Sequence, residues 1–311
     1  MRTGRAQTIE VDALRRELAG WFAPRSLDRV LGRPTTETQR LLREWLSRGG
    51  RRWRPLLTAG TYRALQRNGH PRDSMDLHRL AVAVECFHKA SLVHDDIEDG
   101  DSLRDGRPTL HAEYGVPTAL NVGDLLLGEG YRLIAALEIG AARKAALLRV
   151  AAEAHRDLCI GQGRELSWVR KPGPLTAAGV LAIYRGKTSP AFRVALRFGS
   201  ILAGADRRVA GALDRFSGHV GVAYQFRDDL DDVRPSSQAA SRASVPAFAV
   251  RGRAGRRRRP AMATSGQMTW LAARLDDHAR EALRACRALR QAELRDFLSD
   301  VCGRILSRGC R

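Results

Sequence analysis

Two acidic runs with the same pattern limit what this chain can fold into. Each reads Asp-Asp-x-x-Asp, at residues 95–99 and 228–232, and each ends an apolar stretch of helical period. Positions i and i+4 share a helix face, so the outer aspartates of each run point the same way. Carboxylates gathered on one face repel one another unless a cation lies among them. A single run is as often a solvated helix end, but the repetition disfavours that interpretation.

Oxygen ligands in this arrangement favour magnesium. Mg²⁺ prefers hard oxygen ligands, keeps some of its waters and shares its coordination with substrate phosphates. Two such runs facing one cavity would hold a diphosphate between them through bridging ions. The sequence therefore predicts a magnesium-assisted site for a diphosphate substrate.

Apolar residues recur at helical spacing along most of the chain and predict an all-α fold. Alternating strand patterns are missing from the sequence. The predicted helices are residues 9–22, 35–46, 56–68, 76–98, 118–138, 142–166, 175–185, 188–203, 207–232, 267–289 and 292–307. Residues 233–261 are rich in Arg, Ser and Pro and are predicted to form an atypical long loop. We expect one helical domain over residues 1–311.

Composition disfavours several classes of protein. The net charge of +19 comes largely from arginines spread over helix faces, and no nucleic-acid motif accompanies them, so no nucleic-acid partner is expected. No run approaches the ~18 apolar residues of a membrane span, and no signal peptide is visible. The five cysteines are scattered without a C-x-x-C pair and predict neither zinc nor disulfides. We expect a cytoplasmic enzyme.

Further motifs carry a family resemblance. The basic motif at residues 49–55 combines two glycines, which let the backbone turn, with arginines that match phosphate oxygens near a helix start. Together with residues 92–99, 106–109, 161–162, 186–188 and 224–232, it resembles the trans-polyprenyl diphosphate synthases, of the class I isoprenoid synthase superfamily. The resemblance covers about residues 45–232.

The resemblance implies a fold and a reaction. The fold is a single orthogonal helical bundle around a deep central cavity, with two aspartate motifs at its mouth that hold three Mg²⁺ ions. An allylic diphosphate loses its diphosphate and is joined to isopentenyl diphosphate, giving a longer trans-polyprenyl diphosphate. Members of the family are usually homodimers, and we expect peripheral membrane contact through the product.

The resemblance also assigns roles to residues. The metal ligands would be Asp95, Asp96, Asp99, Asp228, Asp229 and Asp232. The allylic diphosphate or the cation would be contacted by Arg104, Lys187, Thr188 and Gln225, and isopentenyl diphosphate by Arg51, Arg54 and His88. Taken singly, Arg104, Lys187 and Gln225 are as often surface ion pairs or helix caps. A lone histidine on an apolar helix, such as His88, is more often a core residue.

Product length is predicted from the residues that precede the first motif. Ala90 stands five positions before Asp95, where short-chain enzymes of the family often carry an aromatic residue. Phe87, one turn earlier, is the candidate floor of the cavity. A small residue at 90 leaves room for growth, so we expect a product of C20 or longer.

The sequence departs from the family at three places. Asp105 stands where a second arginine usually follows Arg104, and a carboxylate there repels the isopentenyl diphosphate anion. Glu165 stands where aspartate is usual, and residues 233–261 do not match the family's lysine- and glycine-containing loop. These departures leave two alternatives open. One is a class I terpene cyclase or lyase that acts on an allylic diphosphate alone, and the other is a weakly active partner subunit of a heteromeric synthase.

Overall fold

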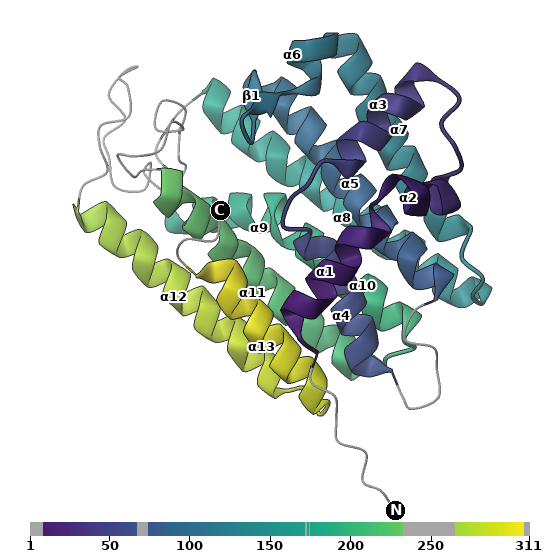
Figure 1. Ribbon diagram of the computed structural model, residues 1–311. Helices are drawn as coiled ribbons and strands as arrows, with labels where there is room; N and C mark the ends of the chain where they lie inside the picture. Colours follow the sequence, from purple (N-terminus) through teal and green to yellow (C-terminus); the bar gives the residue numbers. More distant parts are fainter. Residues whose placement is uncertain (1–8, 67–73, 172, 174, 233–264, 308–311) are drawn as a thin grey trace, which may run out of the picture. The chain divides into compact units, whose positions relative to one another are not determined.

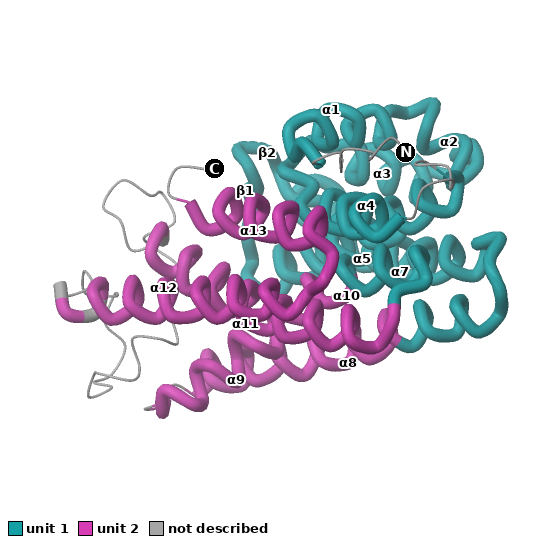
Figure 2. The backbone as a smooth tube through the Cα atoms, turned by 90° about the horizontal axis from the view of Figure 1, so that it is seen from below, with its two compact units in different colours: residues 1–149, 195–205 teal, residues 150–194, 206–311 magenta. Residues whose placement is uncertain are grey.

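The computed structural model describes residues 9–66, 74–171, 173, 175–232 and 265–307 (Figure 1). The predicted loop at 233–261 lies outside the described residues. The chain divides into two compact units, residues 1–149 with 195–205 and residues 150–194 with 206–311 (Figure 2). Each unit is described by itself, and the prediction of a single domain stays a prediction. Within the described residues, no helix combines the length and apolar character that a membrane crossing requires.

Unit 1 is built around one long helix. Its elements are α1 (Val11–Trp21), α2 (Pro24–Leu31), α3 (Glu37–Ser47), α4 (Trp53–Leu65), α5 (Met75–Asp99), β1 (Leu103–Arg104), β2 (Arg107–Pro108), α6 (Leu110–Tyr114) and α7 (Val116–Ala135), with the start of α8 (Ala141–Arg170) and the end of α10 (Ser189–Leu202). Helix α5 packs chiefly against α7 and α4. Its buried residues run almost without interruption from Leu77 to Cys86, which suits a helix covered on most sides.

Two glycines of α7 let α5 approach closely. A Cβ atom on Gly123 would lie 2.4 Å from Nε2 of His94, and one on Gly130 would lie 2.5 Å from Cε1 of Phe87. Both distances are far below van der Waals contact, so a larger residue at either position would force the neighbouring ring to move. The Phe87 ring also meets Tyr131 edge-on, with ring centroids 5.0 Å apart.

Local sequence explains several helix boundaries. Thr36 caps α3 through a capping box with Gln39. Pro24 separates α1, which ends at Trp21, from α2, because it occupies the first turn of α2, where a proline lacks no hydrogen bond. The first acidic run ends α5 at Asp99, and Gly100 closes the helix in the left-handed conformation, at φ 66°.

A small hairpin follows the first acidic run and corrects the strand-free prediction. Leu103 pairs with Pro108 and Arg104 with Arg107 in an antiparallel ladder. The two-residue turn is Asp105-Gly106, with φ values of 50° and 75°. An Asp-Gly turn with positive φ at both positions matches the twist of a hairpin. Asp105 therefore serves the turn and is exposed at its tip.

Unit 2 holds the remaining parts of α8 and α10, with α9 (Ala177–Lys187), α11 (Arg207–Asp232), α12 (Ser265–Arg287) and α13 (Ala292–Leu306). Helix α11 packs against α12 and α9. The core between these three helices surrounds Phe226, whose ring lies 5.3 Å from that of Tyr184 and 5.8 Å from that of Trp270. The second acidic run ends α11 and lies next to this core.

Candidate active site

The first aspartate motif occupies the last turns of α5 in unit 1. Asp95 is half-buried and Asp99 is exposed, whereas Asp96 turns inward and is only 1% exposed. Asp95 and Asp99 are one helical turn apart and share a face, as predicted. The outer aspartates therefore present oxygen donors at the helix end, while Asp96 is part of the interior.

Asp96 is held by Arg104. Nε and Nη2 of Arg104 lie 2.7 and 2.6 Å from Oδ1 of Asp96, because the hairpin folds β1 back onto the end of α5. Burial raises the pKa of the Asp96 carboxyl, and the hydrogen bond from Arg104 opposes that rise. Oδ2 of Asp96 is buried and accepts no hydrogen bond from the described residues. Arg104, predicted to contact the allylic diphosphate, is thus engaged with the motif itself.

The donors of this motif fit magnesium. All are carboxylate oxygens, and the buried Oδ2 of Asp96 still lacks a partner. Among the described residues no three His, Cys, Asp or Glu side chains gather closely enough to hold a metal by themselves. Such an incomplete set is typical of Mg²⁺ sites that water and substrate phosphate complete.

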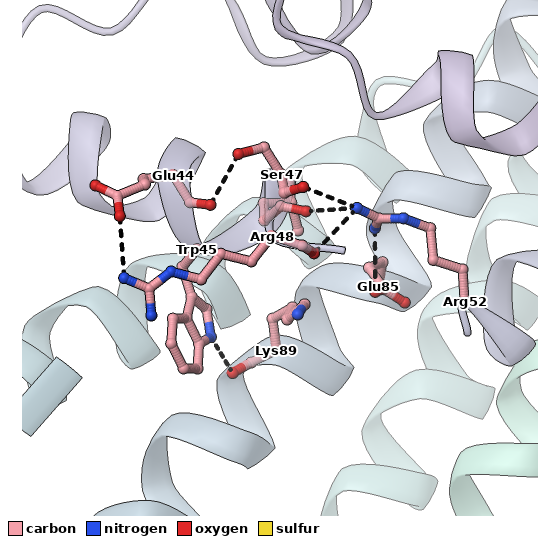
Figure 3. Close-up of polar contacts among 8 residues, drawn as sticks. Glu44, Trp45, Ser47, Arg48, Arg52, Glu85 and Lys89 are labelled. Atoms are coloured by element: carbon pink, nitrogen blue, oxygen red, sulfur yellow. Dashed lines mark hydrogen bonds and ion pairs between the residues drawn. The ribbon is translucent and has the colours of Figure 1, made fainter. Parts of the chain in front are cut away.

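A basic cluster lies farther back along α5 in the same unit (Figure 3). Arg52 precedes α4 in the left-handed conformation, and its Nη1 lies 3.2 Å from Oε1 of Glu85. Its Nη2 donates to the carbonyl oxygens of Leu46, Ser47 and Arg48, at 3.0, 3.4 and 3.3 Å. Arg52 therefore caps the carboxyl end of α3 and ties it to α5. The two arginines assigned to substrate, Arg51 and Arg54, flank it in the sequence and are half-buried.

His88 lies within this cluster. Burial lowers its pKa well below the ordinary value, and the charges of Arg54, Lys89, Arg104 and Arg52 act in the same direction. Its Nδ1 is buried and makes no hydrogen bond to the described residues. Cationic groups that converge around a neutral imidazole favour an anion as the missing partner.

The second motif is organised differently in unit 2. Asp229 is buried and accepts hydrogen bonds from the hydroxyl of Tyr184 and from Nε2 of Gln225, the latter at 3.3 Å. Oγ1 of Thr188 donates to Oε1 of Gln225 at 3.1 Å. The structure therefore brings Thr188, Gln225 and Asp229 into one chain of hydrogen bonds.

The other predicted residues of unit 2 are placed as follows. Lys187 forms an ion pair with Glu165, the residue that departs from the family's aspartate. This pair is set by a close approach of α8 and α9, since a Cβ atom on Gly161 would lie 2.2 Å from the carbonyl carbon of Gly186. Asp228 is half-buried near the end of α11. Asp232 is the last residue of α11, and its side chain lies outside what the structure describes.

The residues that sequence reasoning missed are Arg52, Glu85, Lys89 and Tyr184. No local pattern marks Tyr184 or Glu85, because their partners lie 45 and 33 residues away. Arg52 belongs to the basic motif, but the motif alone does not separate it from its two neighbours. The prediction that the two aspartate motifs face one cavity concerns residues of both units, and it stays a prediction.

A pocket of about 620 Å³ in unit 2 contains none of the predicted residues. Its lining includes Arg156, Arg193 and Asp157, which lie together. Nη2 of Arg193 lies 2.8 Å from Oδ2 of Asp157, and Nη1 of Arg156 lies 3.8 Å from its Oδ1. In each unit we assign the candidate functional residues to the aspartate motif, with the cluster around His88 in unit 1, and not to this pocket.

Comparison with known proteins bears on the family. The model of the polyprenyl synthetase family matches residues 35–243, more than half of the chain. The chain is 33% identical over 220 residues to farnesyl diphosphate synthase of Geobacillus stearothermophilus, covering 65% of this chain and 72% of the relative. It is 30% identical over 197 residues to geranylgeranyl pyrophosphate synthase of Geoglobus acetivorans, covering 62% and 59%. The match thus spans less than two thirds of this second relative.

A solved structure supports the same conclusion for the fold. Geranylgeranyl pyrophosphate synthetase of Pyrococcus horikoshii Ot3 superimposes with a TM-score of 0.75 at 25% identity, covering 96% of each chain. The predicted all-α isoprenoid synthase fold is confirmed. Because the family model covers more than half of the sequence, the chain belongs to the polyprenyl synthetase family, the family of trans-prenyltransferases that the sequence predicts.

Proposed function

We propose that this chain is a magnesium-dependent prenyltransferase that joins an allylic diphosphate to isopentenyl diphosphate. One observation carries the proposal beyond family membership. Helix α5 bears carboxylates at its end, at Asp95 and Asp99, and a cluster of cationic groups around His88 two turns earlier. One set suits metal ions and the other suits an anion, as two diphosphate substrates require.

The residues of the chain divide the work. Asp95, Asp99 and Asp228, with Asp96, Asp229 and Asp232 as predicted, would hold magnesium, for which three ions are expected. Bound magnesium supplies positive charge that stabilises a leaving diphosphate. Asp96 and Asp229 accept hydrogen bonds from Arg104 and from Tyr184, and so fix the helix ends that carry their neighbours.

Substrate anions are bound by the cationic residues. Arg51, Arg54 and His88 would bind isopentenyl diphosphate, since guanidinium groups match phosphate oxygens in pairs. Lys187 is oriented by its ion pair with Glu165, and Thr188 by its hydrogen bond to Gln225. Both would contact the allylic diphosphate or stabilise the cation. Apolar walls keep water from the cation.

The product is proposed to be C20 or longer. Ala90 is fully buried and adds no ring to its surroundings. Phe87 stands one turn earlier, with its ring against Gly130 and Tyr131. These contacts support Phe87 as the floor of the chain-length cavity. The homodimer, the cytoplasmic location and membrane contact through the product stay predictions.

A class I cyclase or lyase remains the second candidate because of Asp105. The hairpin puts a carboxylate at the position where the family carries an arginine for isopentenyl diphosphate. Product analysis by mass spectrometry, from geranyl and farnesyl diphosphate with and without isopentenyl diphosphate, separates the candidates. A longer diphosphate supports the synthase. A hydrocarbon or alcohol from the allylic diphosphate alone supports the cyclase, and no turnover of either supports a partner subunit.

Replacement of a predicted metal ligand tests the magnesium site. Asp95→Ala should reduce turnover by ~10²-fold or more and raise the magnesium concentration needed for half-maximal rate, because a charge-stabilising group is lost. Asp276→Asn is the matched control, since Asp276 is an exposed residue of α12. Equal turnover in wild type and Asp95→Ala, at limiting magnesium, would contradict the assignment.

A further inference from the structure

We propose that Lys89 supplies the positive charge for the diphosphate of isopentenyl diphosphate that residue 105 does not supply. The inference rests on the proposed function and adds a residue to its anion site. It starts from the departure at Asp105, where the expected arginine is replaced by a carboxylate, and from a buried lysine next to His88.

Lys89 is a buried cation without a carboxylate of its own. The residue is 8% exposed, and its backbone carbonyl accepts a hydrogen bond from Nε1 of Trp45 at 3.2 Å (Figure 3). Its Nζ lies 5.6 Å from the centre of the Trp45 ring. Within the described part of the chain the ammonium forms no ion pair or hydrogen bond, and Figure 3 shows no dashed line to it. A buried charge of this kind calls for an anionic partner.

The neighbouring carboxylates already have partners. Glu85 lies one turn before Lys89 on α5 and is paired with Arg52 at 3.2 Å. Asp96 is paired with Arg104 at 2.6 Å. Each of these buried carboxylates thus has its own guanidinium, and within the described residues Lys89 forms no ion pair, although the charge of Glu85 acts on it. His88 precedes Lys89 in the sequence, and the charge of Lys89 is among those that lower the pKa of His88. An anion bound at His88 would therefore lie close to the Lys89 ammonium.

The hairpin that carries Asp105 is tied to the same tryptophan. The guanidinium carbon of Arg48 lies 4.8 Å from the centre of the Trp45 ring, and its Nη1 donates to the carbonyl of Pro108 in β2 at 3.2 Å. The Trp45 ring therefore contacts Lys89, and it also contacts Arg48, which is hydrogen-bonded to the hairpin. Burial lowers the pKa of Lys89, and the charges of Glu85 and, less strongly, Asp105 raise it.

Lysine suits this role because its ammonium is a compact charge on a long flexible stem. It can reach a phosphate oxygen from inside the unit, whereas an arginine at 105 would approach from the hairpin tip. A positive charge could therefore reach the diphosphate either from residue 105 in the exposed turn or from Lys89 on α5, and in this chain it comes from Lys89.

The test compares Lys89→Met with wild type. Methionine keeps the volume and removes the charge. We expect the KM for isopentenyl diphosphate to rise about 10- to 100-fold, with the KM for the allylic diphosphate unchanged within about twofold, as for truncation of one partner of a buried charge pair. Lys144→Met is the matched control, because it removes one charge from unit 1 at a side chain whose Nζ, among the described residues, donates only to the carbonyl of Ala135. It should leave both constants unchanged.

Two further measurements separate failure of this inference from failure of the proposed function. Isothermal titration with isopentenyl diphosphate gives the dissociation constant without turnover, so the Lys89→Met effect is measured even if no longer product forms. Asp105→Arg in the Lys89→Met background should restore at least a third of the lost affinity on a logarithmic scale, and Lys89→Arg should retain binding. Equal dissociation constants for wild type and Lys89→Met would overturn the assignment of Lys89 alone, whereas no binding by wild type would overturn the proposed function together with it.

Discussion

Removal of the Arg52 guanidinium should destabilise the protein far more than removal of a surface arginine. Arg52 and Glu85 have side chains only 10% and 4% exposed, and their closest atoms are 3.2 Å apart. The same guanidinium meets three carbonyl oxygens at the end of α3 and lies 3.8 Å from the centre of the Phe22 ring. In Arg52→Ala the Glu85 carboxylate stays buried without its partner.

The size of the effect follows from that burial. Breaking a buried ion pair by deleting one partner costs about 3–5 kcal/mol, because the remaining charge is desolvated and uncompensated. The second deletion, Glu85→Ala, then removes the cause of that penalty. In a double-mutant cycle the two changes should therefore couple by about 2 kcal/mol or more.

Urea denaturation followed by far-ultraviolet circular dichroism measures the free energy of unfolding of the four proteins in the cycle. The matched control is the Arg40–Glu37 pair of α3, whose side chains are 64% and 65% exposed. An exposed ion pair between residues three apart on a helix contributes about 0.2–0.5 kcal/mol. If Arg52→Ala is no more destabilising than Arg40→Ala, or the coupling is below about 0.5 kcal/mol, the reasoning from burial is refuted.

Two further predictions concern pH and product length. Burial and the charge of His219, whose Nδ1 lies 3.1 Å away, lower the pKa of His278 to about 4. An unfolded histidine titrates near 6.5, so the unfolded state binds more protons between these values and stability falls as pH drops from about 6.5 to 4. His278→Gln should show a smaller fall in melting temperature between pH 7 and pH 5, and an equal fall would contradict this. Phe87→Ala should lengthen the product by at least one isoprene unit in mass spectrometry, and an unchanged length would exclude Phe87 as the floor.

Local patterns predicted where the acidic motifs would lie. Helical periodicity and the glycine at 100 suffice to end α5 at Asp99, and periodicity alone ends α11 at Asp232. The Asp-Gly dipeptide at 105–106 is itself a strong hairpin pattern. The strand-free prediction missed this hairpin because each strand has only two residues, too few for alternation to be visible.

Partnerships between distant residues could not be predicted in the same way. Asp96 and Asp229 follow the metal-ligand pattern, yet the structure engages them with Arg104 and with Tyr184 and Gln225. The motif fixes residue types along one helix, whereas burial depends on which side chains a second element brings near. For the same reason the pairing of Arg52 with Glu85 becomes visible only when α3, α4 and α5 are packed.

The two glycines of α7 have a mechanical consequence for unit 1. Gly123 receives the ring of His94 and Gly130 that of Phe87, and both pairs are separated by the same number of residues on each helix. Sliding α5 along α7 by one turn would drive both rings into side chains that carry a Cβ atom. The register of α5 against α7 is therefore fixed at two points. The carboxylates at the end of α5 are positioned by the same packing that holds the ring of Phe87 in its middle.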